Sequence, residues 1–368
     1  DVESRTNTDY SWKAFAKLSA VDVVPDFTTL AKWEEFFGEK TIRELHDKII
    51  DHCRQKKIIK GSKMRTDTTV SEANIHYPTD ASILFDGIRS ITRTVEKIKQ
   101  TVKIKTIFRS QVKFIKKKIF NLSNSLKKRT GEAKQSAVKT VKEINAAAKK
   151  IIEKARNITK EIKSKALNKM KKMFQEKIKL ADKIINQTDL VLKGINPKDR
   201  IVSFFQPYAR PIVKGKLSKG CEFGKKLEIN EVEHGIISEW KNHIGNPSDM
   251  DLLIPSIDKH KKIFGHDPTE VDTDRGFYSE KNVEDLKTRV KRICIPKRGY
   301  KSKRRLRFEK SKWFVKGQRW RSGGEAKISW FKRSFGGAKS KAKTEKGFDR
   351  NIGLGIIACN LKVIANLA

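Results

Sequence analysis

Acidic residues are scarce in this sequence. Its 368 residues include 43 Asp and Glu against 83 Lys and Arg, so the formal net charge is +40 at pH 7 and the isoelectric point lies near 10.1. This excess is larger than solubility requires, and it implies a polyanionic partner, with nucleic acid favoured over an anionic membrane. The basic residues are spread through periodic sequence instead of forming a terminal tail.

Paired cysteines and long apolar runs are also absent. The four cysteines (Cys53, Cys221, Cys294 and Cys359) stand alone, without CxxC or Cys/His spacing, so neither a disulfide framework nor a zinc site is indicated and free cytoplasmic thiols are expected. No run of 18 apolar residues and no apolar signal core occurs, so we expect a soluble protein with no membrane partner. The first residue is Asp1 instead of Met, which leaves open a truncated amino terminus.

The first 60 residues carry the signals of a small helical module. Asp26 is a candidate helix cap, Thr41 precedes a second amphipathic segment, and Gly38 separates the two. Pairs of short helices bind DNA in many proteins and only pack in many others, so the sequence leaves both roles open for residues 1–60.

Residues 82–200 predict a basic and continuously helical segment. Apolar residues recur at alternating spacings of three and four, and a break near residues 121–131 predicts at least one hairpin of long helices. Between Ile91 and Arg200 we count 32 basic and nine acidic residues, a net charge of +23. This excess favours a phosphate-binding surface over an ordinary solvated face. A helix lying on a membrane is the alternative, although the polar faces are wide for it.

The rest of the chain alternates strands and helices. A β-prone segment within residues 61–81 precedes the helical block. Residues 201–368 continue, after a linker marked by Pro207, Pro211 and Gly215, with strands at FGKKLEIN and GIISEWKNHIG that a short polar turn around residues 233–235 joins. A helix is expected from Ser279, its cap, through Val290, and a basic loop, KRGYKSKRRLRFEKSKW, leads into the helix that carries Glu325. When residues 82–200 are set aside, this order of strands and helices predicts an α/β fold, in which a mixed sheet carries helices on both faces. Residues 61–81 would supply its first strand and residues 201–368 the remainder, with residues 82–200 inserted between them.

Two aspartates occupy notable positions on the expected strands. Asp67 lies in the β-prone segment Met64–Val70 although Asp is disfavoured in strands, and a cap or turn is the ordinary explanation for it. Asp274 comes where the strand VDTD gives way to a turn, the place where α/β sheets carry functional groups. Asp272, two residues earlier on the same face, is the alternative to Asp274.

Glu325 lies in the most basic part of the chain. Residues 291–347 include 21 Lys and Arg and only three acids. On a helix Glu325 would share a face with Arg321 and Lys332. An exposed ion pair with Arg321 explains this glutamate as well as a ligand role does.

The same stretch contains two consecutive glycines. Gly323 and Gly324 would each weaken a helix by about 1 kcal/mol. They indicate either strong packing of this helix or a close approach of its backbone to another group. An apolar stripe would pack this helix against a core, and the stripe consists of Trp320, Ile328, Phe331 and Phe335.

Together the three acids suit a metal site. Mg²⁺ prefers oxygen ligands and takes one or two protein carboxylates, with water and substrate phosphate completing its shell. Two such ions clamp the attacking and leaving oxygens of a displacement at phosphorus. A strand Asp, a strand-end Asp and a helix Glu on a basic surface would supply that site.

These residues resemble the signature of a known family. The segments DTTVSEANIHYPTD, DTDRGFYS and RWRSGGEAKIS are similar to those of the DDE transposases of bacterial insertion sequences. The Y(2)R(3)E(6)K motif of that family falls on Gln318, Arg321, Glu325 and Lys332, so three of four positions match and Gln318 replaces the tyrosine. The resemblance extends from PDFTTLAKW to the last helix. It implies a ribonuclease H-like catalytic fold with a helical insertion, here unusually early, between the first and second strands.

The resemblance implies metal-dependent cleavage at transposon ends and attack of the freed 3′-hydroxyl on target DNA. Asp67, Asp274 and Glu325 would be catalytic and would hold two Mg²⁺ or Mn²⁺ ions. The partners would be double-stranded DNA, as inverted repeats and as target, with a possible homodimer on paired ends, in the bacterial cytoplasm at the nucleoid. DNA contacts would come from Arg321, Lys332, Arg275, Arg319, Lys327 and Trp330, the last as a candidate for stacking on an extruded base.

Two other functions stay open. A catalytically inactive or domesticated DNA-binding derivative is one, which the three acids oppose and the absent initiator Met favours. A nuclease of the same fold is the other, and terminal inverted repeats around the gene would separate it from a transposase. In the enzyme interpretation the three acids converge although 207 and 51 residues separate them.

Overall fold

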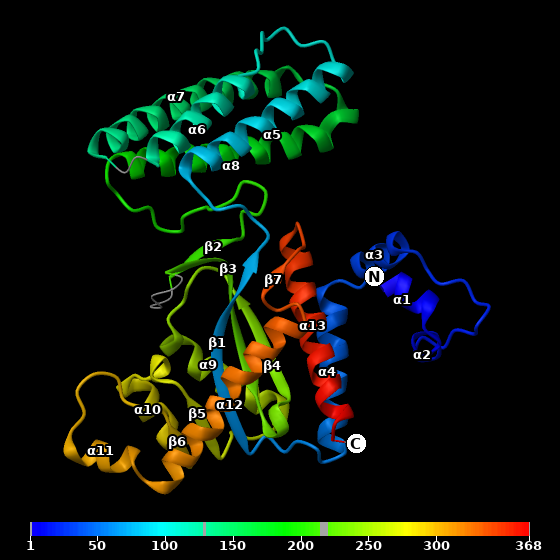
Figure 1. Cartoon of the computed structure of the whole chain (residues 1–368), viewed down its shortest axis with the longest axis vertical. Coiled ribbons are helices and arrows are strands. Elements are labelled where there is room, and N and C mark those ends of the chain that lie inside the picture. The colour runs from blue at the N-terminus through cyan, green and yellow to red at the C-terminus, as the bar shows by residue number, and fades with distance from the viewer. Residues whose placement is uncertain (1, 128–129, 214–219, 368) are drawn as a thin grey trace. The chain divides into compact units, whose positions relative to one another are not determined.

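Thirteen α-helices and one mixed sheet of seven strands make up the part of the chain that the computed structural model describes, residues 2–127, 130–213 and 220–367 (Figure 1). The predicted α/β class is confirmed. The chain forms two compact units, one of residues 1–69, 227–242 and 248–368 and one of residues 70–226 and 243–247. The division falls within strands β1 (Lys63–Ala73) and β3 (Cys221–Glu231).

The second unit is dominated by four long helices that pack on one another. Its core contains side chains that are fully or almost fully buried, including Ile91, Ile144 and Phe174. The predicted break near residues 121–131 is confirmed, whereas further breaks at 102–111 and 162–167 were not predicted. The helices are α5 (Asp80–Thr101), α6 (Val112–Leu126), α7 (Gly131–Glu161) and α8 (Asn168–Leu192).

The segment expected to be a linker contains a strand. Strand β2 (Arg210–Val213) includes Pro211 and pairs antiparallel with β3. A proline lacks the backbone N–H that a central strand needs, and β2 lies at one end of the strand order, where a proline is tolerated. Gly215, the third linker residue, lies outside the described residues.

The sheet has the order β2-β3-β1-β5-β6, with β4 paired to β3 and β7 paired to β1. Strands β1, β5 and β6 are parallel, and in this register Thr66 pairs with Thr273. The predicted hairpin between β3 and β4 is confirmed, with a short 3₁₀ turn at Glu233–Gly235. The remaining strands are β4 (Ile237–His243), β5 (Glu270–Thr273), β6 (Arg292–Cys294) and β7 (Lys339–Ser340).

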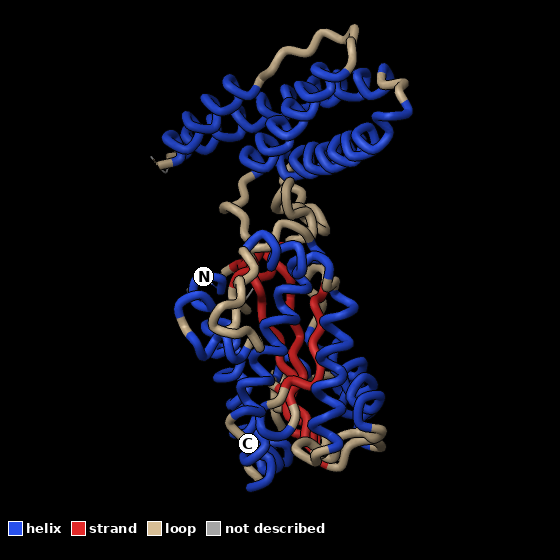
Figure 2. Tube along the Cα trace, turned by 90° about the vertical axis from the view of Figure 1, so that its right-hand side faces the viewer, coloured by secondary structure: helices blue, strands red, loops and turns tan. Residues whose placement is uncertain are grey.

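Helices of the first unit lie on both sides of its strands (Figure 2). Helices α9 (Asp249–Phe264) and α10 (Glu280–Lys287) share an apolar core with Met64 and Val271. Residues next to these in sequence point to the opposite face, because side chains alternate along a strand. That face is covered by α12 (Lys312–Ser334).

The amino-terminal helices are α1 (Val2–Thr8), α2 (Tyr10–Phe15), α3 (Phe27–Phe36) and α4 (Glu39–Gln55). Asp26 caps α3 as predicted, whereas α4 begins directly after Gly38 and so places Thr41 inside its first turn. Residues 1–60 carry 11 acidic and 11 basic residues, a net charge of zero. Phosphate binding depends on positive charge, so this balance favours packing over DNA binding for the module.

Helix α13 (Glu345–Ala365) closes the chain and packs against α4. Its buried side chains include Phe348, Ile352 and Ile356. None of the described helices, including α13, is both long enough and apolar enough to cross a membrane.

Candidate functional site

Asp67 and Asp274 each follow a register partner on two adjacent parallel strands. Thr66 pairs with Thr273, the last residue of β5, so the next residues are Asp67 on β1 and Asp274 directly after β5. Asp67 therefore belongs to a strand, and the cap or turn explanation for it was wrong. Its Oδ1 accepts a hydrogen bond from the Thr68 N–H at 2.7 Å. Asp274 caps a short 3₁₀ turn by accepting from the Gly276 N–H, also at 2.7 Å.

Glu325 reaches the same neighbourhood from α12. The pKa of Asp67 is raised to about 6, mainly by burial and then by the Asp274 carboxylate, with a smaller increase from Glu325 and a decrease from the Arg321 guanidinium. Groups after β5 and on α12 therefore act electrostatically on Asp67 of β1. Glu325 is 65 % exposed and forms the i,i+4 ion pair with Arg321 that the sequence offered as its ordinary explanation.

The three acids offer the oxygen ligands that a divalent cation prefers, but they are not arranged to hold one ion together. Among the residues that the structure describes, no three His, Cys, Asp or Glu side chains are placed to hold one metal ion. The neighbouring carboxylates of Asp67 and Asp274 repel each other, which the raised pKa of Asp67 reflects, and a bound cation would relieve that repulsion. These two residues fit a cation, whereas Glu325 would first have to leave Arg321.

A layer of buried charge lies between the sheet and α12. Arg65 and Glu231, 8 % and 2 % exposed, form an ion pair with Nη2 and Oε2 2.6 Å apart. Lys63 Nζ lies 2.5 Å from Glu270 Oε1 on the same face. Arg65 also donates to the Trp320 carbonyl and stacks over the Trp320 ring, with 4.7 Å from Cζ to the ring centroid. A hydrogen bond and a cation–π contact from Arg65 therefore hold α12 on the sheet in addition to apolar packing.

The glycines of α12 allow this close contact. A Cβ at Gly323 would lie 2.9 Å from Arg65 Nη1, and one at Gly317 would collide with Asp272 Oδ1. Close backbone approach is thus the reason for glycine in a helix where it costs stability. The apolar stripe contributes as well, although only Phe331 of its four predicted members is fully buried.

Asp272 does not belong to the acidic cluster. It is fully buried beneath Gly317, and neither carboxylate oxygen has a hydrogen-bond partner among the described residues. Its pKa is raised to about 7, mainly by burial and then by the Glu270 carboxylate, while the charges of Lys63 and Arg65 lower it. Asp67 is influenced by Asp274 instead, so the geometry favours Asp274 as the second acid.

The titration of Asp272 predicts an unusual pH dependence of stability in the metal-free protein. Its pKa is about 7 in the folded state against an ordinary 3.8, so the folded state binds more protons than the unfolded state between these values. The free energy of unfolding should therefore fall as pH rises from about 4 to 7, by about 1.4 kcal/mol for each unit of pKa difference. Asp272→Asn should remove its own share of this fall and stabilise the protein at pH 8 by roughly 2 to 4 kcal/mol, while the raised pKa of Asp67 still lowers stability between about pH 4 and 6.

Urea unfolding of both proteins at pH 5 and pH 8 measures the effect. Asp285→Asn, at an exposed position of α10, is the matched control and should leave the pH dependence unchanged. Equal pH dependence in the wild type and Asp272→Asn would show that the carboxylate ionises freely in the fold.

Three of the predicted DNA contacts are arginines that are either exposed or adjacent to the acids. Arg275 and Arg319 are exposed, on the turn after Asp274 and on α12 respectively. Arg321 is 15 % exposed and engaged with Glu325. Lys332 is half-buried, about three turns beyond Arg321 on α12.

Lys327 and Trp330 are occupied within the protein. Burial lowers the pKa of Lys327, whose neighbours include Cys359 and Glu231 in the charged layer. Its Nζ also lies 4.8 Å from the Trp330 ring centroid, and that ring packs edge-on against Phe335 at 4.7 Å. Both side chains are half-buried and make contacts within this fold, and their role in DNA binding stays a prediction.

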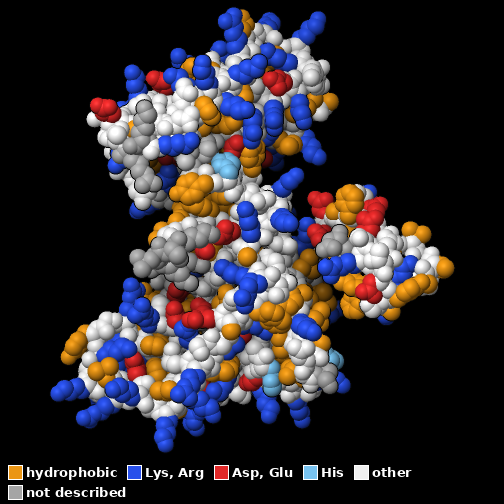
Figure 3. Space-filling view, viewed as in Figure 1, with side chains coloured by type: hydrophobic (Ala, Val, Ile, Leu, Met, Phe, Trp, Pro, Cys, Tyr) orange, Lys and Arg blue, Asp and Glu red, His pale blue; other side chains and the backbone are white. Residues whose placement is uncertain are grey.

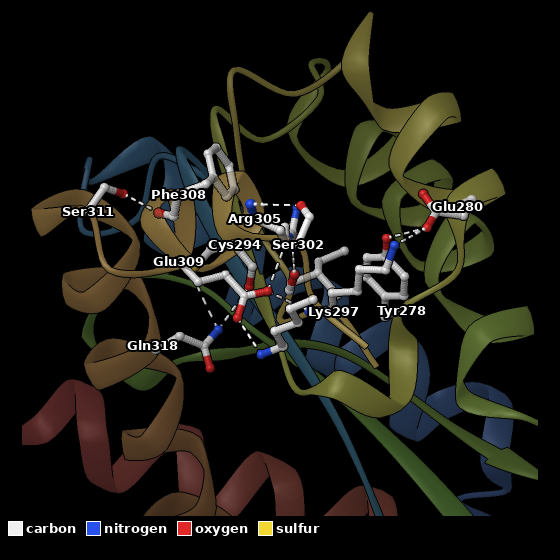
Figure 4. Close-up of polar contacts among 12 residues, drawn as sticks. Tyr278, Glu280, Cys294, Lys297, Ser302, Arg305, Phe308, Glu309, Ser311 and Gln318 are labelled. Atoms are coloured by element: carbon white, nitrogen blue, oxygen red, sulfur yellow. Dashed lines mark hydrogen bonds and ion pairs between the residues drawn. The ribbon is translucent and has the colours of Figure 1, made fainter. Parts of the chain in front are cut away.

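Gln318 ties α12 to the strand ends. Its Nε2 donates to the Thr273 carbonyl at 3.1 Å and to the Cys294 carbonyl at 2.9 Å (Figure 4 shows Gln318 beside Cys294). These bonds join the helix that carries Glu325 to the strand that ends at Asp274. The residue that departs from the family motif is thus a fixed structural contact.

A further acid beside the cluster was not predicted. Asp249, in the first turn of α9, accepts a hydrogen bond from Thr68 Oγ1 at 2.9 Å, and its other oxygen lies close to Gly276. Acids are common in the first turn of helices, where they interact favourably with the helix dipole. Asp249 and the neighbouring Asp251 therefore look alike in sequence, and only the tertiary fold separates them.

No family model, curated protein or solved structure matches this chain. What the protein does must therefore be inferred from its own side chains.

Proposed function

We propose that this chain is a DDE transposase, with a ribonuclease H-like catalytic fold, which cleaves DNA at transposon ends and joins them to target DNA. The observation that carries the proposal is the register of β1 and β5. It sets Asp67 beside Asp274, and α12 brings Glu325 and Arg321 into their electrostatic neighbourhood. Carboxylates gathered in so basic a chain are best explained by a cation that they share.

Asp67 and Asp274 would hold Mg²⁺ or Mn²⁺, and Glu325 would join them on releasing Arg321. When bound, two such ions would activate the attacking oxygen and stabilise the leaving one. The freed Arg321 guanidinium would then be available to a phosphate, for which its planar fork is well suited. In this proposal the Arg321–Glu325 ion pair is the resting arrangement of the site, which opens when cation and DNA arrive.

The charge distribution supports DNA as the partner. The helical segment carries a net charge of +23 between Ile91 and Arg200, and Figure 3 shows many blue side chains on the visible face of this helical unit, among white and orange ones. The amino-terminal module contributes no net charge. DNA would therefore be held by the helical segment and by the basic region around α12. A homodimer on paired ends and a place at the bacterial nucleoid belong to the same proposal.

The test is a cleavage and joining assay. Purified chain with Mg²⁺ and DNA carrying its own element's ends should release 3′-hydroxyl ends and join them to a target plasmid. Cleavage without joining would instead indicate a nuclease. Tight DNA binding with no cleavage in either Mg²⁺ or Mn²⁺ would indicate an inactive derivative, in which the Arg321–Glu325 pair is permanent.

Glu325→Gln should reduce cleavage by at least about 100-fold, because the third carboxylate is removed and a few kcal/mol of transition-state stabilisation go with it. DNA affinity should change little, since positive charge dominates binding. Single-turnover cleavage and fluorescence anisotropy measure the two effects separately. Equal reductions of both would assign Glu325 a folding role through its pairing with Arg321.

A further inference from the structure

The segment between β6 and α12 is a folded arm. The sequence predicted a basic loop there, but residues 303–309 form helix α11 (Lys303–Glu309), capped by Ser302, whose Oγ accepts from the Arg305 N–H at 3.2 Å. We call residues 297–312 the α11 arm. It leads directly into α12, the helix that carries Arg321 and Glu325.

Glu309 anchors the α11 arm from within. Its side chain is 11 % exposed, and its carboxylate accepts from the Lys297 N–H at 2.8 Å, from Arg305 Nε at 2.8 Å and from Lys301 Nζ at 2.5 Å (Figure 4). These three donors come from both ends of the loop and from the helix itself. The only acid between Lys291 and Glu325 is therefore used to close the arm.

Further contacts fix the arm to the body of the first unit. Lys297 Nζ lies 2.9 Å from Glu280 Oε1, and the same glutamate accepts from the Tyr278 hydroxyl at 2.8 Å. Arg305 donates to the Ile295 carbonyl, and its guanidinium stacks over Tyr278 with 5.6 Å from Cζ to the ring centroid. The arm is thus held in place by contacts that engage only three of its cations.

All exposed charged side chains of the α11 arm are basic. Figure 3 shows the blue side chains that project from this region. Tyr300, at 89 % exposure, adds an aromatic ring among them. Six cations are exposed and form no ion pair with any residue that the structure describes: Arg298, Lys303, Arg304, Arg307, Lys310 and Lys312.

We propose that the α11 arm is a preformed binding surface for the phosphodiester backbone of DNA, an inference that rests on the proposed function. Six unpaired cations held on a rigid arm would repel one another without a polyanion to neutralise them. Three of the six are arginines, whose fork suits phosphate, and an exposed tyrosine among cations is typical of surfaces that hold unpaired nucleotides. The arm would hold the DNA flank next to the acids, because it continues into α12.

A glutamate substitution separates this proposal from simple electrostatics. Glu309→Gln adds one positive charge to the chain, so electrostatics alone predicts tighter DNA binding. The arm proposal predicts weaker binding, by at least about 5-fold, because Lys301 and Arg305 lose their anchor and the surface is no longer preformed. Glu284→Gln, at an exposed position of α10, adds the same charge without touching the arm and should bind within about 2-fold of wild type.

A charge-removal series keeps the proposal testable if Glu309→Gln fails to fold. The triple variant Arg304→Gln, Arg307→Gln, Lys310→Gln should bind DNA at least about 10-fold more weakly and lower the slope of log affinity against log salt by about 2.7, or about 0.9 for each phosphate that the arm no longer neutralises. The matched control removes three exposed lysines from the amino-terminal module (Lys48→Gln, Lys56→Gln, Lys60→Gln) and should change the slope little.

All affinities are measured by anisotropy in EDTA, so the outcome does not depend on catalysis. Equal effects of the two triple variants, or tighter binding by a folded Glu309→Gln, would overturn the arm proposal and leave the proposed function standing. Arm variants that no longer bind anionic vesicles but keep DNA affinity would overturn it in favour of a lipid surface. Weak DNA binding by the arm variants in a protein that never cleaves would support the arm and count against the transposase.

Discussion

Asp274→Asn is expected to lower Mg²⁺-dependent cleavage by at least about 1,000-fold, or roughly 4 kcal/mol of transition-state stabilisation. Asn keeps the size of the side chain and can still accept the hydrogen bond from the Gly276 N–H that caps the turn after β5. Only the charge is removed. Asp67 would lose the neighbour that contributes to its raised pKa, and a cation would lose one of its two proposed ligands.

The matched control for this experiment lies two residues away. Asp272→Asn makes the same substitution two residues earlier, in β5, but Asp272 is buried under Gly317 and is not among the main charges that act on Asp67. It should leave cleavage within about 3-fold and DNA affinity unchanged, because positive charge dominates binding. Cleavage assays and anisotropy assays on both variants measure the catalytic rate and the DNA affinity. The reverse result, with Asp272 essential and Asp274 dispensable, would move the site beneath α12.

The strand-end acids could be predicted because their signals are local. A short β-prone run ends just before Arg275 and Gly276, and the place of Asp274 at the strand end, directly after β5, follows from that pattern alone. The helix after it, with Ser279 as its cap, was predicted for the same reason and is confirmed, with a hydrogen bond from the Asn282 N–H. Asp67 needed the resemblance, because a lone Asp in a strand has several ordinary explanations.

The charged layer could not be predicted, because its partners are far apart in sequence. Arg65 and Glu231 are separated by 166 residues, with the whole helical segment between them. No periodic pattern indicates that a buried carboxylate will meet a buried guanidinium. The paired glycines of α12 were a usable hint, since they indicated a close approach, but they did not reveal that Arg65 lies beneath them.

Helix α11 was missed for a different reason. Its seven residues include four cations, which repel one another in an isolated helix. A helix so short is also unstable alone and depends on tertiary contacts. Glu309 and the ring of Tyr278 supply those contacts. Sequence patterns describe the chain by itself, so they favoured a loop where the fold provides a helix.

Arg65→Met is expected to destabilise the protein by about 3 to 5 kcal/mol, the usual cost of leaving one partner of a buried ion pair uncompensated. Glu231 is 2 % exposed, and burial already raises its pKa while Arg65 is present. Without Arg65 it must either stay ionised in an apolar site or take up a proton. The Trp320 carbonyl would lose its donor as well, so α12 should loosen along its glycine-rich turn.

The double variant Arg65→Met, Glu231→Met distinguishes an uncompensated charge from the absence of a favourable bond. If the single variant suffers from an uncompensated carboxylate, the double variant should regain most of the stability, since apolar side chains of similar volume often replace a buried pair at little cost. Urea unfolding at pH 7.5 measures both. A double variant as unstable as the single one would instead mean that the Arg65 contacts to Trp320 hold α12 on the sheet. In that case cleavage should fail in both variants, because the helix that carries Glu325 would no longer be held beside Asp67.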